Sequence, residues 1–223
     1  MRRSADSPAK DETAEGFVLA GGASSRMGRD KALVEVAGKP LVEHALAILR
    51  EAGVTARIAG TRAELSGCAP VVEDGGGGPL AGVCAALGAT KAELAVFLPV
   101  DMPLVPPSLV RSLLHHSRVT SAVVTVPSAC GYAQTFPAVV RREALGELKD
   151  SLEGGEGGCF GAFRQAAQRL NQRFAQIAVE ELAQCGQAEH PLEVAAACWL
   201  MNVNTPDEAA RAERLLLATV RVS

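Results

Sequence analysis

Short apolar runs alternate along the chain with stretches whose apolar residues recur at helical spacing. The runs predict strands at 16–20, 57–59, 70–72, 93–99, 121–126, 135–140, 174–179 and 199–203. The helical spacing predicts helices at 41–52, 80–89, 108–116, 142–149, 160–169 and 206–218. Because strands and helices alternate throughout, we expect an α/β fold: a Rossmann-like, doubly wound, mostly parallel sheet with helices on both faces.

Residues 93–99 form the most strand-like segment, apolar enough to be a central strand buried on both faces. Pro40 and Gly53 bracket the first predicted helix, and Ser108 is expected to N-cap the helix that follows it. In sheets of this kind ligands bind at the carboxyl ends of the strands, near a topological switch point. Residues that directly follow strands are therefore the candidates for a site.

Polar residues dominate positions 1–15, which we expect to be a disordered tail before a single domain at 16–218 and a C-terminal tail at 219–223. The first segment lacks the apolar centre of a secretory signal, and no apolar run is long enough to span a bilayer. Six cysteines are scattered without a Cys-x-x-Cys pair, which is typical of buried thiols in a reducing compartment. We therefore expect a cytoplasmic protein.

Charge limits the kinds of partner that the chain can bind. Lys and Arg number 22 against 25 Asp and Glu, the formal net charge is -3, and only 4% of residues are aromatic. Polyanionic surfaces select basic proteins, and single-stranded nucleic acids stack on aromatic side chains, so we expect neither nucleic acid nor membrane as partner. An anion that binds here is expected to be small and held by a local group of donors.

A glycine-rich loop with two cations follows the first predicted strand. Gly21 and Gly22 are adjacent and the next glycine is Gly28, with Arg26 and Lys31 beside it. Glycines let backbone N–H groups approach a phosphate, and the two cations can neutralise a triphosphate. The spacing differs from the dinucleotide-binding GxGxxG pattern and from the GxxxxGK[ST] phosphate loop. The alternative is a plain strand-to-helix turn, which would not require an Arg and a Lys at these places.

Three further loops at the same predicted edge carry candidate residues. Gly78–Gly82 opens a helix, whose free N–H groups can bind an anion or a base carbonyl. Asp101 follows the most buried strand and suits Mg²⁺ held by one or two carboxylates plus substrate phosphates, or alternatively caps the next turn. Asn204 either lies in the cleft or, like Thr205, N-caps the closing helix that begins at Pro206.

The segment 16–41, GFVLAGGASSRMGRDKALVEVAGKPL, closely resembles the LAGGxSxRMGxDK and GKPL signature of the nucleotidyltransferases related to the molybdenum cofactor guanylyltransferase, the MobA-like NTP transferases. The family's GPLAG, PxDxP and NVNTPED elements are matched at 78–82, 99–103 and 202–208, the last with one change. The resemblance covers about residues 16 to 210, and its specificity lies in these four motifs. Family members often have a His-Pro or similar pair after the fifth strand, where residues 131–137 of this chain read GYAQTFP, so a role for Gln134 at the acceptor stays open.

The resemblance implies a role for the residues of each motif. Nucleotide-binding residues would be Leu19, Ala20, Gly21, Gly22, Lys31, Asp74, Gly78, Pro79, Leu80 and Asp101. Catalytic residues would be Arg26, Lys31 and Asp101, with Asp101 as the metal ligand. Asn204 would contact the acceptor, supported by Asn202. In the family, an acidic residue before the GPLAG helix lies near the guanine or ribose. The glycine run that follows Glu73 and Asp74 is shorter than usual, so the choice between the two stays open, with Asp74 favoured.

The resemblance also implies the reaction. An acceptor phosphate would attack the α-phosphorus of Mg-GTP and release pyrophosphate, with Mg²⁺ as cofactor. Leu-Ala-Gly-Gly in place of the LAAG of cytidylyl-transferring relatives favours GTP, with Mo-molybdopterin as acceptor and with molybdenum cofactor biosynthesis proteins or recipient molybdoenzymes as partners. Transfer from CTP to molybdopterin, transfer to a sugar or cobinamide phosphate, and a non-catalytic nucleotide-binding regulator remain alternatives. The failed GxGxxG spacing disfavours a nicotinamide-dependent oxidoreductase.

Overall fold

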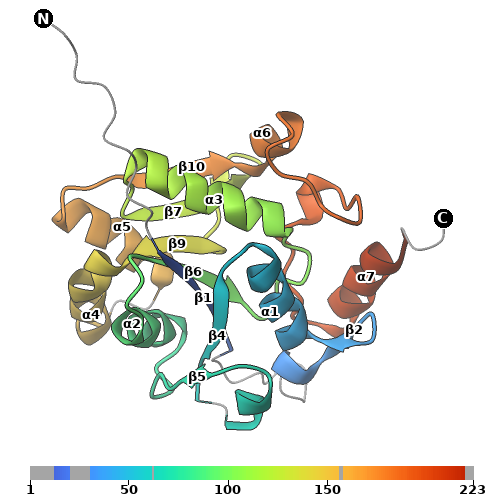
Figure 1. Ribbon diagram of the computed structural model, residues 1–223, viewed down its shortest axis with the longest axis horizontal. Coiled ribbons are helices and arrows are strands. Elements are labelled where there is room, and N and C mark those ends of the chain that lie inside the picture. Colours follow the sequence, from blue (N-terminus) through green and yellow to red (C-terminus); the bar gives the residue numbers. More distant parts are fainter. Residues whose placement is uncertain (1–12, 21–30, 62, 156–157, 219–223) are drawn as a thin grey trace, which may run out of the picture.

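The computed structural model describes residues 13–20, 31–61, 63–155 and 158–218, called the described residues below (Figure 1). The main sheet has the strands β1 (Ala14–Leu19), β4 (Thr55–Ala59), β5 (Val71–Val72), β6 (Leu94–Pro99), β7 (Val124–Ala129), β8 (Tyr132–Ala133), β9 (Ala138–Arg141) and β10 (Phe174–Ala178). Their order is β10-β7-β9-β6-β1-β4-β5, with β8 paired to β7. Strands β1, β4, β5 and β6 run parallel to one another, and β10 runs parallel to β7. Strand β9 is antiparallel to both of its neighbours, β6 and β7. The predicted mostly parallel α/β sheet is thus confirmed.

Two layers of helices cover the sheet (Figure 1). One layer contains α1 (Leu41–Glu51), α3 (Pro107–Thr120), α6 (Val179–Gln184) and α7 (Pro206–Leu217), and the other contains α2 (Pro79–Ala89), α4 (Leu145–Glu153) and α5 (Cys159–Arg169). Successive strand residues point to opposite faces, so in β1 Val18 joins the core under the first layer and Phe17 and Leu19 join the core under the second. Both faces of the sheet are therefore buried, as the apolar strands predict.

The switch point of the sheet lies between β1 and β6. The chain runs outward from β1 through β4 to β5 and then crosses back to place β6 on the other side of β1. The two strands pair in parallel from Ala14 with Leu94 to Leu19 with Pro99, so both end at the same edge. The loops that follow them therefore face one crevice, where open α/β sheets bind their ligands.

The structure corrects three local predictions. Residues 199–203 are not a strand, because the N–H group of Val203 donates to Asp101 O (2.8 Å) rather than to a ladder, and Trp199 and Val203 are buried without one. Ser108 does not cap α3, which has Pro106 as N-cap and Pro107 at its first position. Strand β1 begins at Ala14, so residues 14 and 15 belong to the sheet and not to the predicted tail. Residues 1–12 and 219–223 lie outside the described residues.

Several short elements were not predicted. They are the 3-10 helices η1 (Lys31–Leu33), η2 (Ala63–Gly67), η3 (Arg142–Ala144) and η4 (Ala196–Cys198), the strands β2 (Glu35–Val36), β3 (Lys39–Pro40) and β8, and helix α6. Elements this short have too few residues to show a periodicity in sequence. Among them η1 matters most, because it carries Lys31. No helix in the described part of the chain is both long and apolar enough to cross a membrane.

Candidate active site

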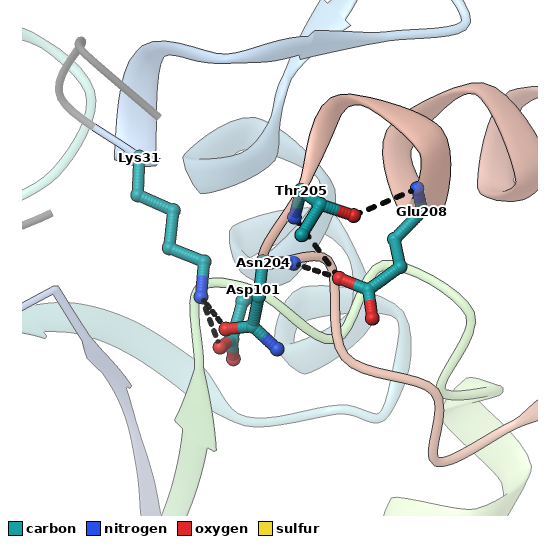
Figure 2. Close-up of polar contacts among 5 residues, drawn as sticks. All are labelled: Lys31, Asp101, Asn204, Thr205 and Glu208. Atoms are coloured by element: carbon teal, nitrogen blue, oxygen red, sulfur yellow. Dashed lines mark hydrogen bonds and ion pairs between the residues drawn. The ribbon is translucent and has the colours of Figure 1, made fainter. Parts of the chain in front are cut away.

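Three segments that are distant in sequence meet at the carboxyl edge beside the switch point (Figure 2). The turn after β6 carries Asp101, η1 carries Lys31, and the loop before α7 carries Asn204. Backbone hydrogen bonds hold these loops: Val100 N–H donates to Leu19 O (3.1 Å), and Val203 N–H donates to Asp101 O (2.8 Å). The site is therefore attached to the central strands through the backbone as well as through side chains.

The ammonium group of Lys31 joins the three segments. Its Nζ lies 2.6 Å from Asp101 Oδ2 and 2.5 Å from Asn204 Oδ1. The Lys31 and Asp101 side chains are only 20% and 19% exposed, so the pair is partly shielded from water and less screened by salt than a surface ion pair. Lys31 is 70 residues from Asp101 and 173 residues from Asn204 in sequence. This contact therefore depends on the whole topology.

The second carboxylate oxygen of Asp101 has the properties of a metal ligand. Asp101 Oδ1 is buried and has no hydrogen-bond partner among the described residues, which is costly for a carboxylate unless another group binds it. The described residues hold no group of three or more His, Cys, Asp and Glu side chains that could bind a metal ion by themselves. A lone carboxylate fits Mg²⁺, which is commonly bound through one or two carboxylates and the phosphates of a substrate.

Helix α2 approaches the end of β1 at a glycine. A Cβ on Gly82 would lie 3.3 Å from Leu19 Cδ2 and 3.4 Å from Asp74 Oδ2. Asp74 Oδ1 also accepts the N–H of Gly76 (2.9 Å), whereas Glu73 is exposed. Of the two acidic residues, Asp74 is therefore the one that lies against the N-terminal part of α2.

The N-terminus of α2 is built by Gly78–Leu80. Gly78 is the N-cap with φ 84°, a conformation that L side chains rarely adopt, and Pro79 takes the first helical position. Leu80 is buried in the core. Ala20 is also buried and donates its N–H to Ala59 O (3.0 Å). The other predicted residues of the first loop, Gly21, Gly22 and Arg26, lie outside the described residues.

A cavity of about 370 Å³ lies beside the N-terminal residues of α2, and several candidate residues line it. Its walls include Pro79, Leu80, Asn202 and Gln134, together with Pro99, Met102, Thr135, Phe136, Gly158, Cys159 and Leu200. Asn202 and Gln134 thus line one hollow, while Asn204 contacts Lys31 instead. The site has two compartments, an ion cluster and a mixed polar and apolar cavity.

The one thiol in the wall of this cavity is not activated. Burial raises the pKa of Cys159 to about 12, and the neighbouring thiol of Cys84 adds to the shift. Burial likewise raises the pKa of Cys84. Because the thiolate is the nucleophile, Cys159 contributes a neutral surface at neutral pH. The arrangement suits chemistry in which a substrate supplies the attacking group.

Comparison with known proteins shows the family of the chain. A model of the MobA-like NTP transferase domain matches residues 16–221. The chain belongs to the MobA-like NTP transferase family. A molybdenum cofactor guanylyltransferase of Shewanella amazonensis is 30% identical over 209 residues, which are 91% of this chain and 96% of that protein. One of Xanthomonas euvesicatoria pv. vesicatoria is 46% identical over 105 residues, 46% of this chain and 54% of its own length.

A solved structure shows the same fold. The crystal structure of molybdopterin-guanine dinucleotide biosynthesis protein A from Archaeoglobus fulgidus superposes with a TM-score of 0.72 at 22% identity, over 90% of this chain and 97% of the other. The MobA-like NTP transferase family that the resemblance in sequence predicted is therefore confirmed. The chain is a nucleotidyltransferase of this family.

One residue that contacts the cluster was not predicted from the sequence. Glu208, in the first turn of α7, accepts hydrogen bonds at Oε2 from the N–H groups of Asn204 (2.7 Å) and Thr205 (3.0 Å), and its own N–H donates to Thr205 Oγ1 (3.2 Å) (Figure 2). The spacing of Thr205 and Glu208 is that of a capping box, so a signal for this residue was present. The N-cap role predicted for Thr205 is confirmed.

Proposed function

We propose that this protein is a molybdenum cofactor guanylyltransferase. It transfers GMP from Mg-GTP to the terminal phosphate of Mo-molybdopterin and forms the guanine dinucleotide cofactor and pyrophosphate. The observation that carries the proposal is the cluster of Lys31, Asp101 and Asn204 at the β1–β6 switch point of a MobA-like fold. The names of the relatives from Shewanella and Xanthomonas support the choice of reaction.

The triphosphate and the metal are assigned to the ion cluster. Lys31 and Arg26 bind the phosphates, and Asp101 holds Mg²⁺ through the carboxylate oxygen that has no partner among the described residues. When bound, Mg²⁺ neutralises charge on the phosphates and makes the α-phosphorus more electrophilic. Lys31 is held in place by two oxygen atoms before any substrate arrives, so its charge is already oriented.

The reaction needs no covalent enzyme intermediate. An oxygen of the acceptor phosphate forms a bond to the α-phosphorus of GTP, the bond from that phosphorus to the bridging oxygen breaks, and pyrophosphate leaves with the electron pair. The acceptor phosphate carries the attacking negative charge, so no residue must be activated as a nucleophile. The raised pKa of the Cys159 thiol agrees with this mechanism, in which the protein contributes orientation and charge neutralisation.

The two substrates are assigned to neighbouring compartments. The guanine and ribose lie along Leu19, Ala20, Gly21, Gly22, Asp74, Gly78, Pro79 and Leu80. The acceptor contacts Asn204 and Asn202, and the cavity that Asn202 shares with Gln134 supports this side for the pterin. Pro79 and Leu80 also line this cavity, so they lie where the two substrates meet. We place the reaction in the cytoplasm, with molybdenum cofactor biosynthesis proteins or recipient molybdoenzymes as partners and with neither nucleic acid nor membrane.

The decisive experiment supplies the purified protein with Mo-molybdopterin and one triphosphate at a time. Mg-GTP is expected to produce the guanine dinucleotide and an equal amount of pyrophosphate, detected by chromatography and by a coupled phosphate assay. Faster turnover of Mg-CTP would assign the protein to the cytidylyl type. Pyrophosphate release with a sugar phosphate or cobinamide phosphate in place of the pterin would assign that compound as the acceptor. Binding of GTP without any turnover would support the regulator instead.

A further inference from the structure

The contacts of Glu208 extend beyond those needed to cap a helix. A capping box consists of the bond from the Glu208 N–H to Thr205 Oγ1 and the return bond from the Thr205 N–H to the Glu208 carboxylate. Glu208 Oε2 also accepts the N–H of Asn204, at 2.7 Å the shortest of the three bonds. This additional bond ends on the residue whose side chain contacts Lys31.

Together these bonds determine the backbone conformation of Asn204. The N–H of Asn204 belongs to the peptide unit before its Cα, and the N–H of Thr205 belongs to the peptide unit after it. Since both units donate to one oxygen atom of Glu208, the φ and ψ angles of Asn204 are restrained from both sides. These angles set the direction of the Cα–Cβ bond, from which the side chain extends to place Oδ1 2.5 Å from Lys31 Nζ.

The charge state of Glu208 is suited to this task. The N–H of Asn204 contributes most to lowering the pKa of the Glu208 carboxyl, burial opposes the shift, and Thr205 and the charge of Lys31 add smaller decreases. An ionised carboxylate makes shorter and stronger hydrogen bonds to N–H groups than a neutral acceptor does. Glu208 is therefore an acceptor at neutral pH.

We propose that Glu208 is a positioning residue, which holds the Asn204 side chain against Lys31 and so keeps the Lys31 ammonium group beside Asp101. Glu208 acts through the loop and is not assigned any contact with substrate. Its effect on turnover rests on the proposed nucleotidyl transfer, whereas its effect on Asn204 does not depend on which substrates are used.

Kinetics of three alanine variants separate positioning from helix capping. Thr205→Ala removes one half of the capping box and leaves the bond to the Asn204 N–H, and Asp207→Ala is a control for charge in the same helical turn. Thr205→Ala and Glu208→Ala are each expected to lower the melting temperature by about 2–4 °C. Only Glu208→Ala is expected to lower kcat, by roughly tenfold or more, because misplacing a catalytic group is costly. An equal loss of kcat in Thr205→Ala would overturn the proposal.

Glu208→Gln tests whether position or charge matters, because its amide oxygen can accept the same two bonds. We expect this variant to recover kcat to within about threefold of the wild type. A loss as large as that of Glu208→Ala would show that the charge acts directly on Lys31 and would overturn the positioning role.

A spectroscopic experiment does not depend on the substrates. The chain has three asparagines, Asn171, Asn202 and Asn204, so ¹⁵N-asparagine labelling yields three side-chain amide signals that single variants can assign. The Asn204 signal is expected to shift towards the value of a free amide in Glu208→Ala, and to stay near its wild-type position in Thr205→Ala and Glu208→Gln. An unchanged Asn204 signal in Glu208→Ala would overturn the proposal. If the wild type fails to transfer GMP while these shifts occur, the proposed function fails and the positioning role stands.

Discussion

At the scale of the residue, Lys31 and Asp101 depend on each other. Both side chains are partly buried, and each neutralises the charge of the other. Only one oxygen of the Asp101 carboxylate takes part in the contact. The amide of Asn204 adds a neutral acceptor and no charge, so the ammonium group keeps capacity to attract phosphates. The arrangement therefore presents a cation and an available carboxylate oxygen side by side, as a metal-bound triphosphate requires.

Lys31→Ala or Asp101→Ala is expected to lower kcat/KM for guanylyl transfer by a hundredfold or more, about 3 kcal/mol of transition-state stabilisation. Each variant removes a charge that lies at the cluster. Steady-state rates with purified acceptor measure the effect, and the exposed Lys39 and Asp207, changed to alanine, are matched controls. Turnover close to the wild-type rate in either cluster variant would contradict the assigned roles.

At the scale of the element, α2 connects the stability of the fold to the proposed nucleotide site. Its two glycines have different surroundings. A Cβ on Gly82 would lie 3.3 Å from Leu19 and 3.4 Å from Asp74, whereas a Cβ on Gly88 would have no atom within 4 Å. Alanine favours the helical state more than glycine does by about 0.5–1 kcal/mol, chiefly by restricting the unfolded chain. The same substitution is therefore expected to have different consequences at the two positions.

Gly88→Ala is expected to raise the free energy of unfolding by about 0.5–1 kcal/mol and to leave GTP binding unchanged. Gly82→Ala is expected to gain less stability, because Leu19 or Asp74 must move, and to weaken GTP binding about tenfold, or about 1.4 kcal/mol. Denaturant unfolding and titration calorimetry measure the two quantities. Equal affinities for GTP in both variants would contradict the placement of the nucleotide beside Gly82.

At the scale of the whole molecule, two histidines are expected to make the free energy of unfolding depend on pH. Burial lowers the pKa of His190, whose Nδ1 accepts the N–H of Leu192 (3.1 Å). Burial also lowers the pKa of His116, and the charges of Arg173 and His115 lower it further. Both imidazoles are thus favoured in the neutral form in the folded state. As pH falls below the ordinary value of 6.5, the unfolded chain takes up protons first, and stability decreases towards the lowered folded pKa values.

His190→Asn is expected to make the free energy of unfolding less dependent on pH between about pH 7 and about pH 5. Asparagine offers an oxygen at the place of Nδ1 and can still accept the N–H of Leu192, so the turn is kept. Denaturant unfolding at several pH values measures the change, and adding His116→Gln is expected to reduce the dependence further. A pH dependence equal to that of the wild type in both variants would show that neither histidine is responsible.

Much of the fold could be predicted because local patterns of apolar residues, prolines and glycines indicate its strands and helices. The apolar run at 93–99 required a strand buried on both faces, and Pro40 and Gly53 marked the ends of a helix that the structure places at Leu41–Glu51. The prediction of a strand at 199–203 was wrong. Trp199 and Val203 are buried in the core, but their N–H groups donate to Ala196 O and Asp101 O and not to a neighbouring strand. Apolarity reports burial, and only hydrogen-bond partners distinguish a strand from a buried loop.

The sequence by itself determined the chemistry available at the site: a lysine and an aspartate after two strands, an Asn-Val-Asn-Thr-Pro segment before the last helix, and the family they indicate. Only the tertiary structure decided which of these groups touch. Lys31 meets Asn204 across 173 residues because the crossover from β5 to β6 brings the ends of β1 and β6 to one edge and α7 folds back beside them. Contacts at such separation depend on how all the elements pack, which no local pattern encodes.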